Sequence, residues 1–456
     1  MMRAFSLAEI TPLVQGILRG DNLFFSRVST DTRTLPQGAL YVALSGERFD
    51  GHDLIREAQR AGACAIVAEK QVDAGMPVVQ VRDSRYALGR LAGLNRAEYP
   101  GKLVGITGSS GKTTTRQMMQ TVLAENGAVT ATEGNLNNDV GVPLTLFRLA
   151  PDADYAVVEL GASGLGEIAW TGSLAAPDVG IITNASEAHL DGFGSLANIV
   201  SAKGEIIDSV RNEGTVILNH DDPAFADWRA RAGMRRVLSV SAAGDQDASL
   251  RAESIHEDAD GVAFTLVGYA ITATDIQLPI PGRHNVANAL LVAAAAHSLE
   301  LSMDQVASGL VKTPAVGGRL EPMRLRPGLC ILNDSYNANP ASMAAALWTL
   351  ATMPAPRFAL LGDMAELGAE AENQHREMGE MARTLGIERL MVTGSHASDY
   401  AGGFGNRTYT GDVPEALADQ VWDEMGEVAS ILIKGSRSAG MDRAVTRLTE
   451  RNNDTC

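Results

Sequence analysis

The chain is poor in cysteine, in basic charge and in long apolar stretches, and each shortage excludes a class of protein. Its three cysteines among 456 residues are Cys64, Cys330 and Cys456. An odd number at such wide spacing argues against a disulfide framework and suits a reducing compartment. Neither a CxxC nor an HExxH motif occurs, so a zinc site has no support.

Basic residues are outnumbered, with 38 Lys and Arg against 55 Asp and Glu, which leaves a formal net charge of −17. Proteins that bind nucleic acid regardless of sequence need a basic face to displace counterions, so no nucleic-acid partner is expected. Residues 1–83 carry nine basic and ten acidic side chains, so most of the excess acidity lies further along. A phosphate-bearing ligand must therefore be held locally, by backbone N–H groups, one or two cations, or metal ions.

Long apolar stretches are also missing. The longest run, at 289–296, is far shorter than the roughly 20 residues that span a bilayer. The stretch 1–20 interrupts its apolar positions with Glu9, Gln15 and Arg19, so it lacks a signal-peptide core. With 45% hydrophobic and 20% charged residues, the composition is typical of a globular protein. We expect a cytoplasmic protein without membrane insertion.

Strand-like and helix-like segments divide the chain into three α/β units, at 1–83, 84–312 and 313–456. The first has short strand-like runs at 39–44, 65–68 and 78–81 and a helical stretch at 52–61. The second begins with a helix at 86–99, has strands expected at 103–108, 155–160, 179–183 and 215–218, and closes with a helix at 285–299. Its continuous apolar runs indicate a parallel sheet buried on both faces. The third repeats the alternation, with strands expected at 330–332, 358–361, 389–393 and 431–434, and has the size of a dinucleotide-binding-like domain.

The strongest motif is Gly-Ser-Ser-Gly-Lys-Thr at 108–113, between an expected strand and an expected helix. In such a loop glycines let backbone N–H groups point at phosphate oxygens, Lys112 supplies a cation, and Thr113 offers a hydroxyl to Mg²⁺. The usual P-loop pattern has a glycine where Ile106 stands. The motif predicts nucleotide binding and no particular reaction, and a tight turn without a ligand is the alternative.

Three further positions, Glu159, His189 and Lys203, are expected at or just past strand ends in the same unit. Ligands of open parallel sheets bind beyond the carboxyl ends of the strands, so Glu159 and His189 should face the P-loop phosphates. A carboxylate and an imidazole there suit Mg²⁺. The plainer alternatives are a solvated acid, a loop histidine and an exposed helix cation.

Three polar segments are also candidate ligand contacts. The turn at 134–139 crowds together three asparagines, and Asn285 and Asn288 stand one helical turn apart, within reach of a base edge. The segment 334–340 follows an expected strand and precedes a helix. A plain turn, a capped helix start and a capping loop are the respective alternatives.

Taken together, these segments resemble the Mur ligases, ATP-dependent amide-forming enzymes of peptidoglycan precursor synthesis. TGSSGKTT, VVELGA, AHLDGFGS, AKGEI, PGRHNVANA, GGR and DSYNANP follow in the family's order over nearly the whole chain. SYNANPASM, LLGDMAELG and IKGSRS are similar to the member that joins D-alanyl-D-alanine to the UDP-N-acetylmuramoyl tripeptide. STDTR and LYVALSGERFDGHD are similar to segments of that enzyme and of the third-residue-adding ligase, whose Asp-Asn-Pro-Arg motif does not occur here.

The resemblance implies a three-domain α/β enzyme. A small N-terminal domain would bind the UDP-sugar, a central P-loop ATPase-like domain with a parallel sheet would bind ATP, and a Rossmann-like C-terminal domain would close over ATP and dipeptide about a hinge near Thr313 and Pro314. The tripeptide carboxylate would attack the γ-phosphate of ATP to give an acyl phosphate and ADP. The dipeptide amine would then displace phosphate. A monomer is expected.

The resemblance also implies roles for individual residues. ATP would be bound by Gly108, Ser109, Ser110, Gly111, Lys112, Thr113, Thr114, His284, Asn285, Asn288, Arg319 and Asp334. Two Mg²⁺ ions would be held by Thr113, Glu159, His189 and a carbamoylated Lys203, and Lys112, Glu159, His189 and Lys203 would be catalytic. Substrate contacts would come from Asp31, Thr32, Arg33, Arg48, His52, Asn138, Tyr336, Asn337 and Asn339. By position alone, the candidates for the dipeptide are Asp363, His375, Lys434 and Arg437.

Competing interpretations are a related amide ligase such as folylpolyglutamate synthase, a P-loop phosphotransferase and a non-catalytic nucleotide switch. The first would leave the N-terminal unit without a purpose. For the third residue of the tripeptide, diaminopimelate and lysine are both compatible with the sequence.

Overall fold

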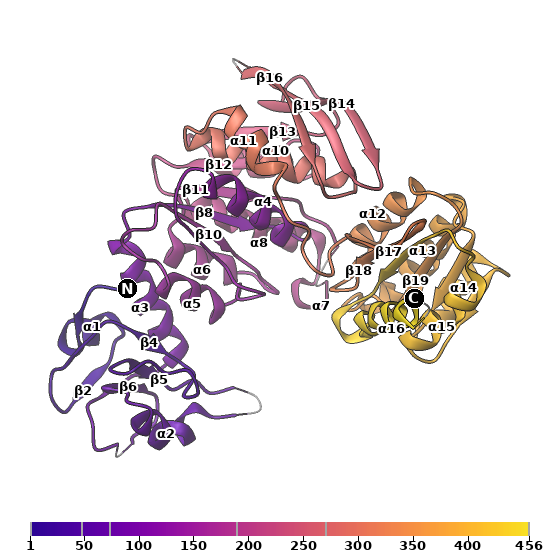
Figure 1. Ribbon diagram of the computed structural model, residues 1–456. Helices are drawn as coiled ribbons and strands as arrows, with labels where there is room; N and C mark the ends of the chain where they lie inside the picture. The colour runs from indigo at the N-terminus through magenta and orange to yellow at the C-terminus, as the bar shows by residue number, and fades with distance from the viewer. Residues whose placement is uncertain (1, 47–48, 73, 188–189, 270, 455–456) are drawn as a thin grey trace.

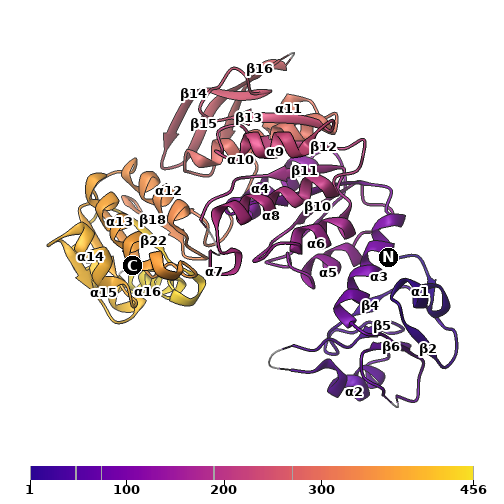
Figure 2. The same cartoon turned by 180° about the vertical axis from the view of Figure 1, so that it is seen from behind.

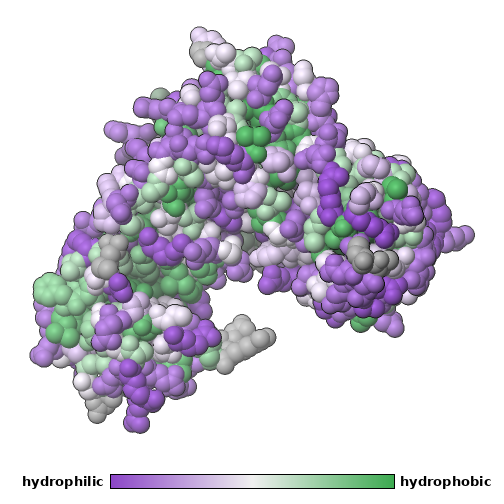
Figure 3. Space-filling model, viewed as in Figure 1, coloured by the Kyte–Doolittle hydropathy of each residue, from purple (hydrophilic) through white to green (hydrophobic). Residues whose placement is uncertain are grey.

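The computed structural model describes residues 2–46, 49–72, 74–187, 190–269 and 271–454. They form three domains arranged as an arch, with the central domain between the other two (Figure 1 and Figure 2). A hollow lies beneath the central domain, between the N-terminal and C-terminal domains (Figure 3). The expected three-domain α/β architecture is confirmed.

The N-terminal domain contains a five-stranded sheet in the order β2-β7-β6-β5-β4. β4 to β7 are parallel, and β2 joins the edge antiparallel to β7. Two apolar clusters pack against the sheet strands, so β5 and β6 are buried throughout. The elements are β1 (Phe5–Ser6), α1 (Leu7–Leu13), β2 (Ile17–Arg19), β3 (Phe24–Phe25), β4 (Val28–Ser29), β5 (Leu40–Val42), the 3-10 helix η1 (Gly51–Leu54), α2 (Ile55–Arg60), β6 (Ala65–Ala68) and β7 (Val78–Gln80).

Helix α3 (Ser84–Glu98) joins the N-terminal domain to the central one. Leu88 and Leu91 pack in the N-terminal core, whereas Ala92 belongs to the central core. Tyr86 at the start of the helix stacks on Trp170, with ring centroids 5.3 Å apart. Because one helix contributes to both cores, the two domains are firmly connected.

The central domain is built on a nine-stranded sheet in the order β16-β15-β14-β13-β12-β11-β8-β10-β9. The seven strands from β14 to β9 in this order are all parallel to their neighbours. The apolar runs predicted four of them, β8, β10, β11 and β12, and their parallel arrangement. The elements are β8 (Lys102–Thr107), α4 (Lys112–Ala124), β9 (Val129–Ala131), α5 (Gly141–Phe147), β10 (Tyr155–Glu159), α6 (Glu167–Ala175), β11 (Val179–Ile182), α7 (Leu190–Phe193), α8 (Leu196–Ser209), β12 (Thr215–Asn219), α9 (Phe225–Ala232), β13 (Arg236–Ser241), β14 (Leu250–Asp258), β15 (Gly261–Gly268), β16 (Ile271–Leu278), α10 (His284–Ser298) and α11 (Met303–Leu310).

The sheet is not wholly parallel, and this corrects the expectation from the sequence. β15 and β16 extend it antiparallel beyond β14. These strands alternate apolar and polar residues, with Phe264, Leu266 and Ile276 buried in the domain core. Alternation marks a strand with one covered face, and a search for continuous apolar runs overlooks it.

The C-terminal domain has a six-stranded sheet in the order β17-β18-β22-β19-β20-β21, parallel except for β17 at the edge. Its elements are β17 (Glu321–Arg326), β18 (Leu329–Asp334), α12 (Pro340–Ala351), β19 (Arg357–Leu361), the 3-10 helix η2 (Gly368–Glu370), α13 (Ala371–Thr384), β20 (Arg389–Val392), α14 (Ala397–Phe404), β21 (Thr408–Thr410), α15 (Pro414–Glu424), β22 (Ala429–Lys434), the 3-10 helix η3 (Arg437–Ala439) and α16 (Asp442–Asn453). Within the described ranges, no helix has the length and apolar character needed to cross a membrane.

Candidate active site

The P-loop connects the carboxyl end of β8 to the first turn of α4. Gly111 precedes the helix with a φ of 80°, and a Cβ at this position would lie 2.8 Å from Asn288 Oδ1. Glycine is therefore required both by the left-handed backbone and by the close approach of α10. The amides of Lys112, Thr113 and Thr114 lie in the first turn of α4, where backbone N–H groups have no helical acceptor, so they are available to an anion.

The segment after β11 supports the P-loop, and the sequence analysis did not identify it. The Ser109 amide donates to the carbonyl of Asn184 (3.0 Å) and the Ser110 amide to Asn184 Oδ1 (3.1 Å). Thr183 Oγ1 donates to the Ser110 carbonyl (2.6 Å), and Ser109 Oγ to that of Ser186 (3.0 Å). Two loop amides are thus already occupied, which leaves phosphate binding to the helix turn. The polar Thr-Asn-Ala-Ser run directly after a buried strand was the available signal.

Lys112 folds back over the loop, and its Nζ donates to the carbonyl of Gly108 (2.6 Å). Desolvation lowers the pKa of Lys112 to about 8, Arg319 lowers it further, and Glu159 opposes the shift. The influence of Arg319 is notable because this residue belongs to the C-terminal domain. Arg319 therefore places a second positive charge close enough to Lys112 to affect its pKa.

Glu159 lies at the carboxyl end of β10, 1% exposed, beside the P-loop. Its Oε2 accepts a hydrogen bond from Thr113 Oγ1 (3.2 Å), and its Oε1 is 3.2 Å from Arg116 Nε. A hydroxyl and a carboxylate in contact form a suitable oxygen donor pair for Mg²⁺. Among the described residues no group of three or more His, Cys, Asp and Glu side chains is placed to hold a metal, so nucleotide or water oxygens would have to complete the shell.

Lys203 lies within α8 and not at a strand end, which corrects the expected placement; the plainer alternative of an exposed cation is also wrong. Only 2% of the residue is exposed. In the described part of the chain no hydrogen bond or ion pair reaches its Nζ, which lies 5.0 Å from the ring centroid of Phe193. Desolvation, with a further contribution from Lys112, lowers the pKa of Lys203 to about 7. His189, its proposed partner at a second metal ion, lies outside the described residues.

A cavity of about 340 Å³ opens between the P-loop and the C-terminal domain. From the central domain it is lined by Ser109, Ser110, Gly111, Thr114, Thr183, Asn184, Ser186, Asn219, His284, Asn285, Ala287 and Asn288. The C-terminal domain contributes Gly318, Arg319, Leu320, Asp334, Asn337, Ala338, Asn339, Ala341, Ser342, Ala345 and Lys434. Residues predicted to bind ATP from two domains are thus brought to one cavity.

The two asparagines of α10 are arranged differently from the expectation. Both are buried, and Asn288 Nδ2 donates to Asn285 Oδ1 (2.9 Å) while Asn285 Nδ2 donates to the carbonyl of Pro281 (2.8 Å). Their side chains therefore fix each other as well as line the cavity. The small residues Ala341 and Ala345 on α12 lie across the cavity and leave room for a flat group.

The carboxyl ends of β18 and β22 hold the C-terminal wall of the cavity together. Asp334 is the last residue of β18, two residues beyond the expected end of the strand, because it pairs in register with Lys434. Lys434 Nζ contacts Asp334 Oδ2 (2.6 Å) and donates to the carbonyl of Asn337 (2.8 Å). Tyr336 carries two guanidinium groups over its ring, those of Arg319 at 4.4 Å and Arg437 at 5.0 Å.

Several predicted contacts already have internal partners. Asn339 caps α12 by accepting from the Ser342 amide (2.8 Å), and Asn138 accepts from the Gly141 amide (2.8 Å) at the start of α5. His375 is fully buried, with Nδ1 2.5 Å from the carbonyl of Ala371 and Nε2 accepting from the Met364 amide (2.9 Å). No ring nitrogen of His375 is left for a dipeptide.

Four of the residues predicted to bind the UDP-sugar, Asp31, Thr32, Arg33 and His52, lie among the described residues of the N-terminal domain. This domain stands at the opposite end of the arch from the C-terminal domain (Figure 1). Arg33 is ion-paired with Asp31 (2.7 Å), and this cation lowers the pKa of Asp31. Thr32 lies between them. His52 is buried, with Nδ1 2.6 Å from Asp50 and Nε2 accepting from the Glu69 amide (3.0 Å), so its ring holds the domain together. Arg48 lies outside the described residues.

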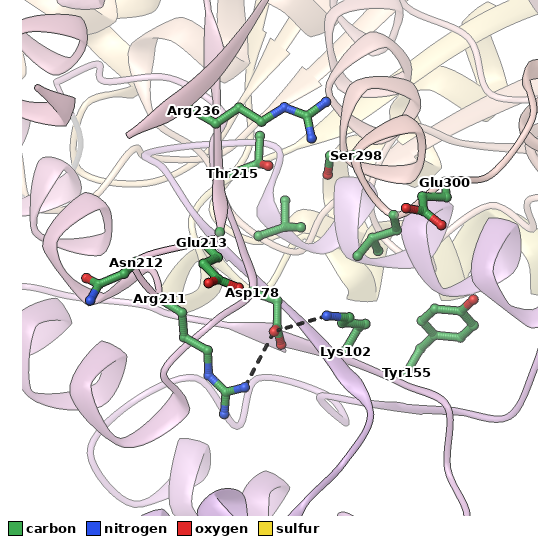
Figure 4. Close-up of a pocket in the computed structure, with 13 residues that line it drawn as sticks. Lys102, Tyr155, Asp178, Arg211, Asn212, Glu213, Thr215, Arg236, Ser298 and Glu300 are labelled. Carbon is green, nitrogen blue, oxygen red and sulfur yellow. Dashed lines mark ion pairs between the residues drawn. The ribbon is translucent and has the colours of Figure 1, made fainter. Parts of the chain in front are cut away.

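A second cavity, of about 730 Å³, lies at the opposite edge of the central sheet, where its strands begin (Figure 4). Asp178 stands between Lys102 (3.8 Å) and Arg211 (3.5 Å) and also binds Arg96 (3.0 Å). Lys102 and Arg211 thus share one carboxylate, and no helix of the described chain begins among the residues that line this cavity. Although larger, this cavity lies away from the P-loop, so the cleft between the domains is the candidate active site.

Comparison with known proteins gives three matching family models along the chain. They are described as the Mur ligase family, catalytic domain (25–96), the Mur ligase middle domain (106–296) and the Mur ligase, glutamate ligase domain (318–437). The chain is 43% identical over 462 aligned residues to the UDP-N-acetylmuramoyl-tripeptide–D-alanyl-D-alanine ligase of Escherichia coli strain K12, with all of both chains covered.

Solved structures agree along nearly the same length. MurF from Acinetobacter baumannii superimposes with a TM-score of 0.92 at 30% identity, covering 98% of this chain and 99% of that one. MurF from Thermotoga maritima in complex with ADP gives a TM-score of 0.85 at 26% identity, covering 94% and 98%.

Proposed function

The chain belongs to the Mur ligase family, and from this premise we propose that it joins D-alanyl-D-alanine to UDP-N-acetylmuramoyl-tripeptide at the expense of ATP. The observation that carries the proposal is a P-loop cavity completed by a second domain, in a chain whose full length matches ligases of this reaction. This step belongs to peptidoglycan precursor synthesis, which places the enzyme in the cytoplasm, and we propose that it acts as a monomer.

The first step brings together two anions, the terminal carboxylate of the tripeptide and the triphosphate of ATP. A carboxylate oxygen attacks the γ-phosphorus, the bond to the β–γ bridging oxygen breaks, and ADP leaves. Mutual repulsion opposes this approach, so neutralisation of charge should dominate catalysis. Lys112, the first-turn amides of α4 and Arg319 supply positive potential from two sides of the cavity.

The second step forms the amide. The dipeptide amine attacks the acyl carbon, phosphate leaves from the tetrahedral intermediate, and the nitrogen loses a proton. Water would compete by hydrolysing the acyl phosphate, so the cavity must exclude it. Arg437 beside Tyr336, on the C-terminal side, is our candidate for the dipeptide carboxylate.

The donor set beside the P-loop fits Mg²⁺. Thr113 and Glu159 would hold the first ion, and His189 with a carbamoylated Lys203 would hold a second. When bound, the ions neutralise phosphate charge and polarise the γ-phosphoryl group. The hydrogen bond between Thr113 Oγ1 and Glu159 Oε2 supports the first of these two positions.

We propose carbamoylation of Lys203 because it is buried and has no hydrogen-bond or ion-pair partner among the described residues. A primary amine attacks the carbon of CO₂ only when neutral, and burial with a pKa of about 7 leaves much of this amine neutral at neutral pH. The nitrogen loses a proton as the new bond forms. The product is a carboxylate-like anion, which converts a costly buried cation into a metal ligand.

For the UDP-sugar we propose the N-terminal domain, around Asp31, Thr32, Arg33, Arg48 and His52. Asn138, Asn337 and Asn339 would meet the tripeptide or dipeptide from the central and C-terminal domains. His52 and Asn339 already have internal hydrogen-bond partners, so we assign them to shaping these surfaces.

The decisive assay measures ADP and phosphate release with UDP-tripeptide, with and without D-alanyl-D-alanine, together with amide formation. A ligase requires both substrates for sustained turnover and yields the amide. A phosphotransferase would release ADP without the dipeptide, and a nucleotide switch would ignore both substrates. Removal of Mg²⁺ by EDTA and the Lys112→Met variant should each abolish product, and an unchanged rate in either case would contradict the charge-neutralisation mechanism.

A further inference from the structure

Arg116 is a buried arginine beside the P-loop for which the proposed reaction has no use. It lies on α4, three residues after Thr113, and is 9% exposed. Its Nε donates to Glu159 Oε1 (3.2 Å), and its Nη1 donates to Gln120 Oε1 (3.0 Å) and Gln117 Oε1 (3.3 Å). The guanidinium is thereby held between a carboxylate and two amides.

The two oxygens of Glu159 are made unequal by this contact. Oε1 faces the fixed positive charge of Arg116, whereas Oε2 faces the hydroxyl of Thr113 (3.2 Å). The backbone of Glu159 is held as well, because its amide donates to Thr132 Oγ1 (3.0 Å). The carboxylate therefore presents one chosen oxygen toward the P-loop.

We propose that Arg116 is a positioning residue that blocks one oxygen of Glu159 and so selects Mg²⁺ over Ca²⁺ at the P-loop. Mg²⁺ demands near-ideal octahedral geometry, whereas Ca²⁺ accepts bidentate carboxylates and more ligands. With Oε1 occupied by the guanidinium, Glu159 can bind through Oε2 alone. This inference rests on the proposed function, because it needs a nucleotide-bound cation beside Thr113.

A purely structural ion pair makes a different prediction. Loss of Arg116 would then lower the stability of the protein, and would weaken nucleotide binding with either cation by the same factor. The ratio of the two affinities separates the roles, because only a constraint on carboxylate geometry changes one cation relative to the other.

The test is calorimetric titration of a non-hydrolysable ATP analogue into the full chain, once with excess Mg²⁺ and once with excess Ca²⁺. In wild type the Mg²⁺ complex should bind more tightly. In Arg116→Met the preference for Mg²⁺ over Ca²⁺ should fall by about tenfold. This is the lower end of the loss in metal affinity that follows removal of a residue that orients a metal ligand. Arg116→Lys keeps a cation without the planar fork and should lie between them. Arg357→Met, at a partly buried arginine paired with Glu388 (3.2 Å) at the start of β19, is the matched control and should keep the wild-type ratio.

The quantity compared is the ratio of the dissociation constant with Ca²⁺ to that with Mg²⁺. If this ratio in Arg116→Met lies within about twofold of the wild-type ratio, and not about tenfold below it, the inference is wrong. Circular dichroism and urea unfolding establish that each variant is folded. If Arg116→Met does not fold, the test depends on Arg116→Lys alone. A ratio of dissociation constants in Arg116→Lys equal to that of wild type would then contradict the proposed positioning role of Arg116. Failure of wild type to bind the analogue with Mg²⁺ would instead contradict the proposed function.

Discussion

At the scale of single residues, Lys203 has the least favourable surroundings near the cavity. Its buried ammonium has lost its hydration, and no hydrogen bond or ion pair from the described residues compensates for that loss. Lys112 adds repulsion, while Glu167 and Glu205 give partial relief. Such a residue lowers the stability of the protein while it stays protonated, which is expected of a group kept for chemistry.

The loss of folding stability caused by the buried Lys203 ammonium should depend on pH. Its pKa is about 7 in the folded chain and 10.5 as the ordinary value, so between these values the unfolded chain holds a proton that the folded one lacks. The destabilisation is therefore greatest below pH 7 and decreases as the pH rises toward 10.5. Lys203→Met should raise the free energy of unfolding by ~2 kcal/mol at pH 6 and by less than half of that gain at pH 9.

Urea unfolding in CO₂-depleted buffer measures both gains. Lys102→Met, at a lysine whose side chain is 61% exposed, is the control and should change stability by less than about 0.5 kcal/mol. Equal gains at the two pH values would show that the Lys203 ammonium is not destabilised by burial.

Removal of the Lys203 side chain should also be open to chemical rescue. Lys203→Ala deletes the proposed carbamate and leaves space beside the second metal position. We expect ligation to fall by about 100-fold and to recover in part when formate or acetate is added. Amide formation with and without the added acid is the readout, and Lys102→Ala should respond to neither change. Full activity of Lys203→Ala in plain buffer would exclude a carbamate.

At the scale of elements, α12 forms one wall of the cavity, and its first turn depends on a cap. Asn339 and Ser342 form a reciprocal capping box, with Asn339 Oδ1 accepting from the Ser342 amide (2.8 Å) and Ser342 Oγ from the Asn339 amide (3.0 Å). The residues that line the cavity, Ala341, Ser342 and Ala345, follow at once. A frayed first turn would displace this wall.

Asn339→Ala should therefore cost about 1 kcal/mol of stability and weaken binding of an ATP analogue several-fold. Asn339→Ser keeps a capping oxygen and should largely restore both. Ser302→Ala removes a comparable capping box from α11, away from the cavity, and should cost similar stability while leaving nucleotide affinity unchanged. Thermal unfolding and calorimetry give the two readouts. Equal nucleotide affinity in Asn339→Ala and Ser302→Ala would contradict a role for the cap in the site.

At the scale of the whole molecule, the C-terminal domain touches the central domain at a few separate points. The turn between β14 and β15 reaches it, where Asp260 is ion-paired with Arg324 and Ala259 packs against the C-terminal core. Asp191 of α7 lies against Gly368. Small contacts of this kind would permit rotation of one domain against the other, and we expect the hinge near Thr313 and Pro314.

We therefore expect the arch to close when its ligands bind. Small-angle scattering should show a smaller radius of gyration with an ATP analogue plus UDP-tripeptide than with neither, because ligand contacts contributed by separate domains favour the closed form. Lys112→Met should bind the nucleotide poorly and keep the open dimensions. Identical curves for wild type with and without ligands would count against closure.

Local sequence patterns predict most of the strands in the parallel parts of the three sheets and their order along the chain. Apolar runs, glycine turns and the GSSGKT motif act over a few neighbouring residues, and the structure places β8, the P-loop and α4 where they predict. The same local patterns underlie the resemblance to the family. The apolar runs did not reveal β9, β13 and β14, nor the extension formed by β15 and β16, whose residues alternate between apolar and polar.

Which polar residues are available to ligands depends on the tertiary fold. Lys203 is buried without a hydrogen-bond or ion-pair partner in the described part of the chain, while His375 and His52 have both ring nitrogens occupied, and no local pattern distinguishes these cases. Burial and hydrogen bonding depend on segments far apart in the chain, such as Asn184 on the P-loop or Lys434 on Asp334. The cavity itself exists because two domains meet, a contact that short-range sequence patterns do not encode.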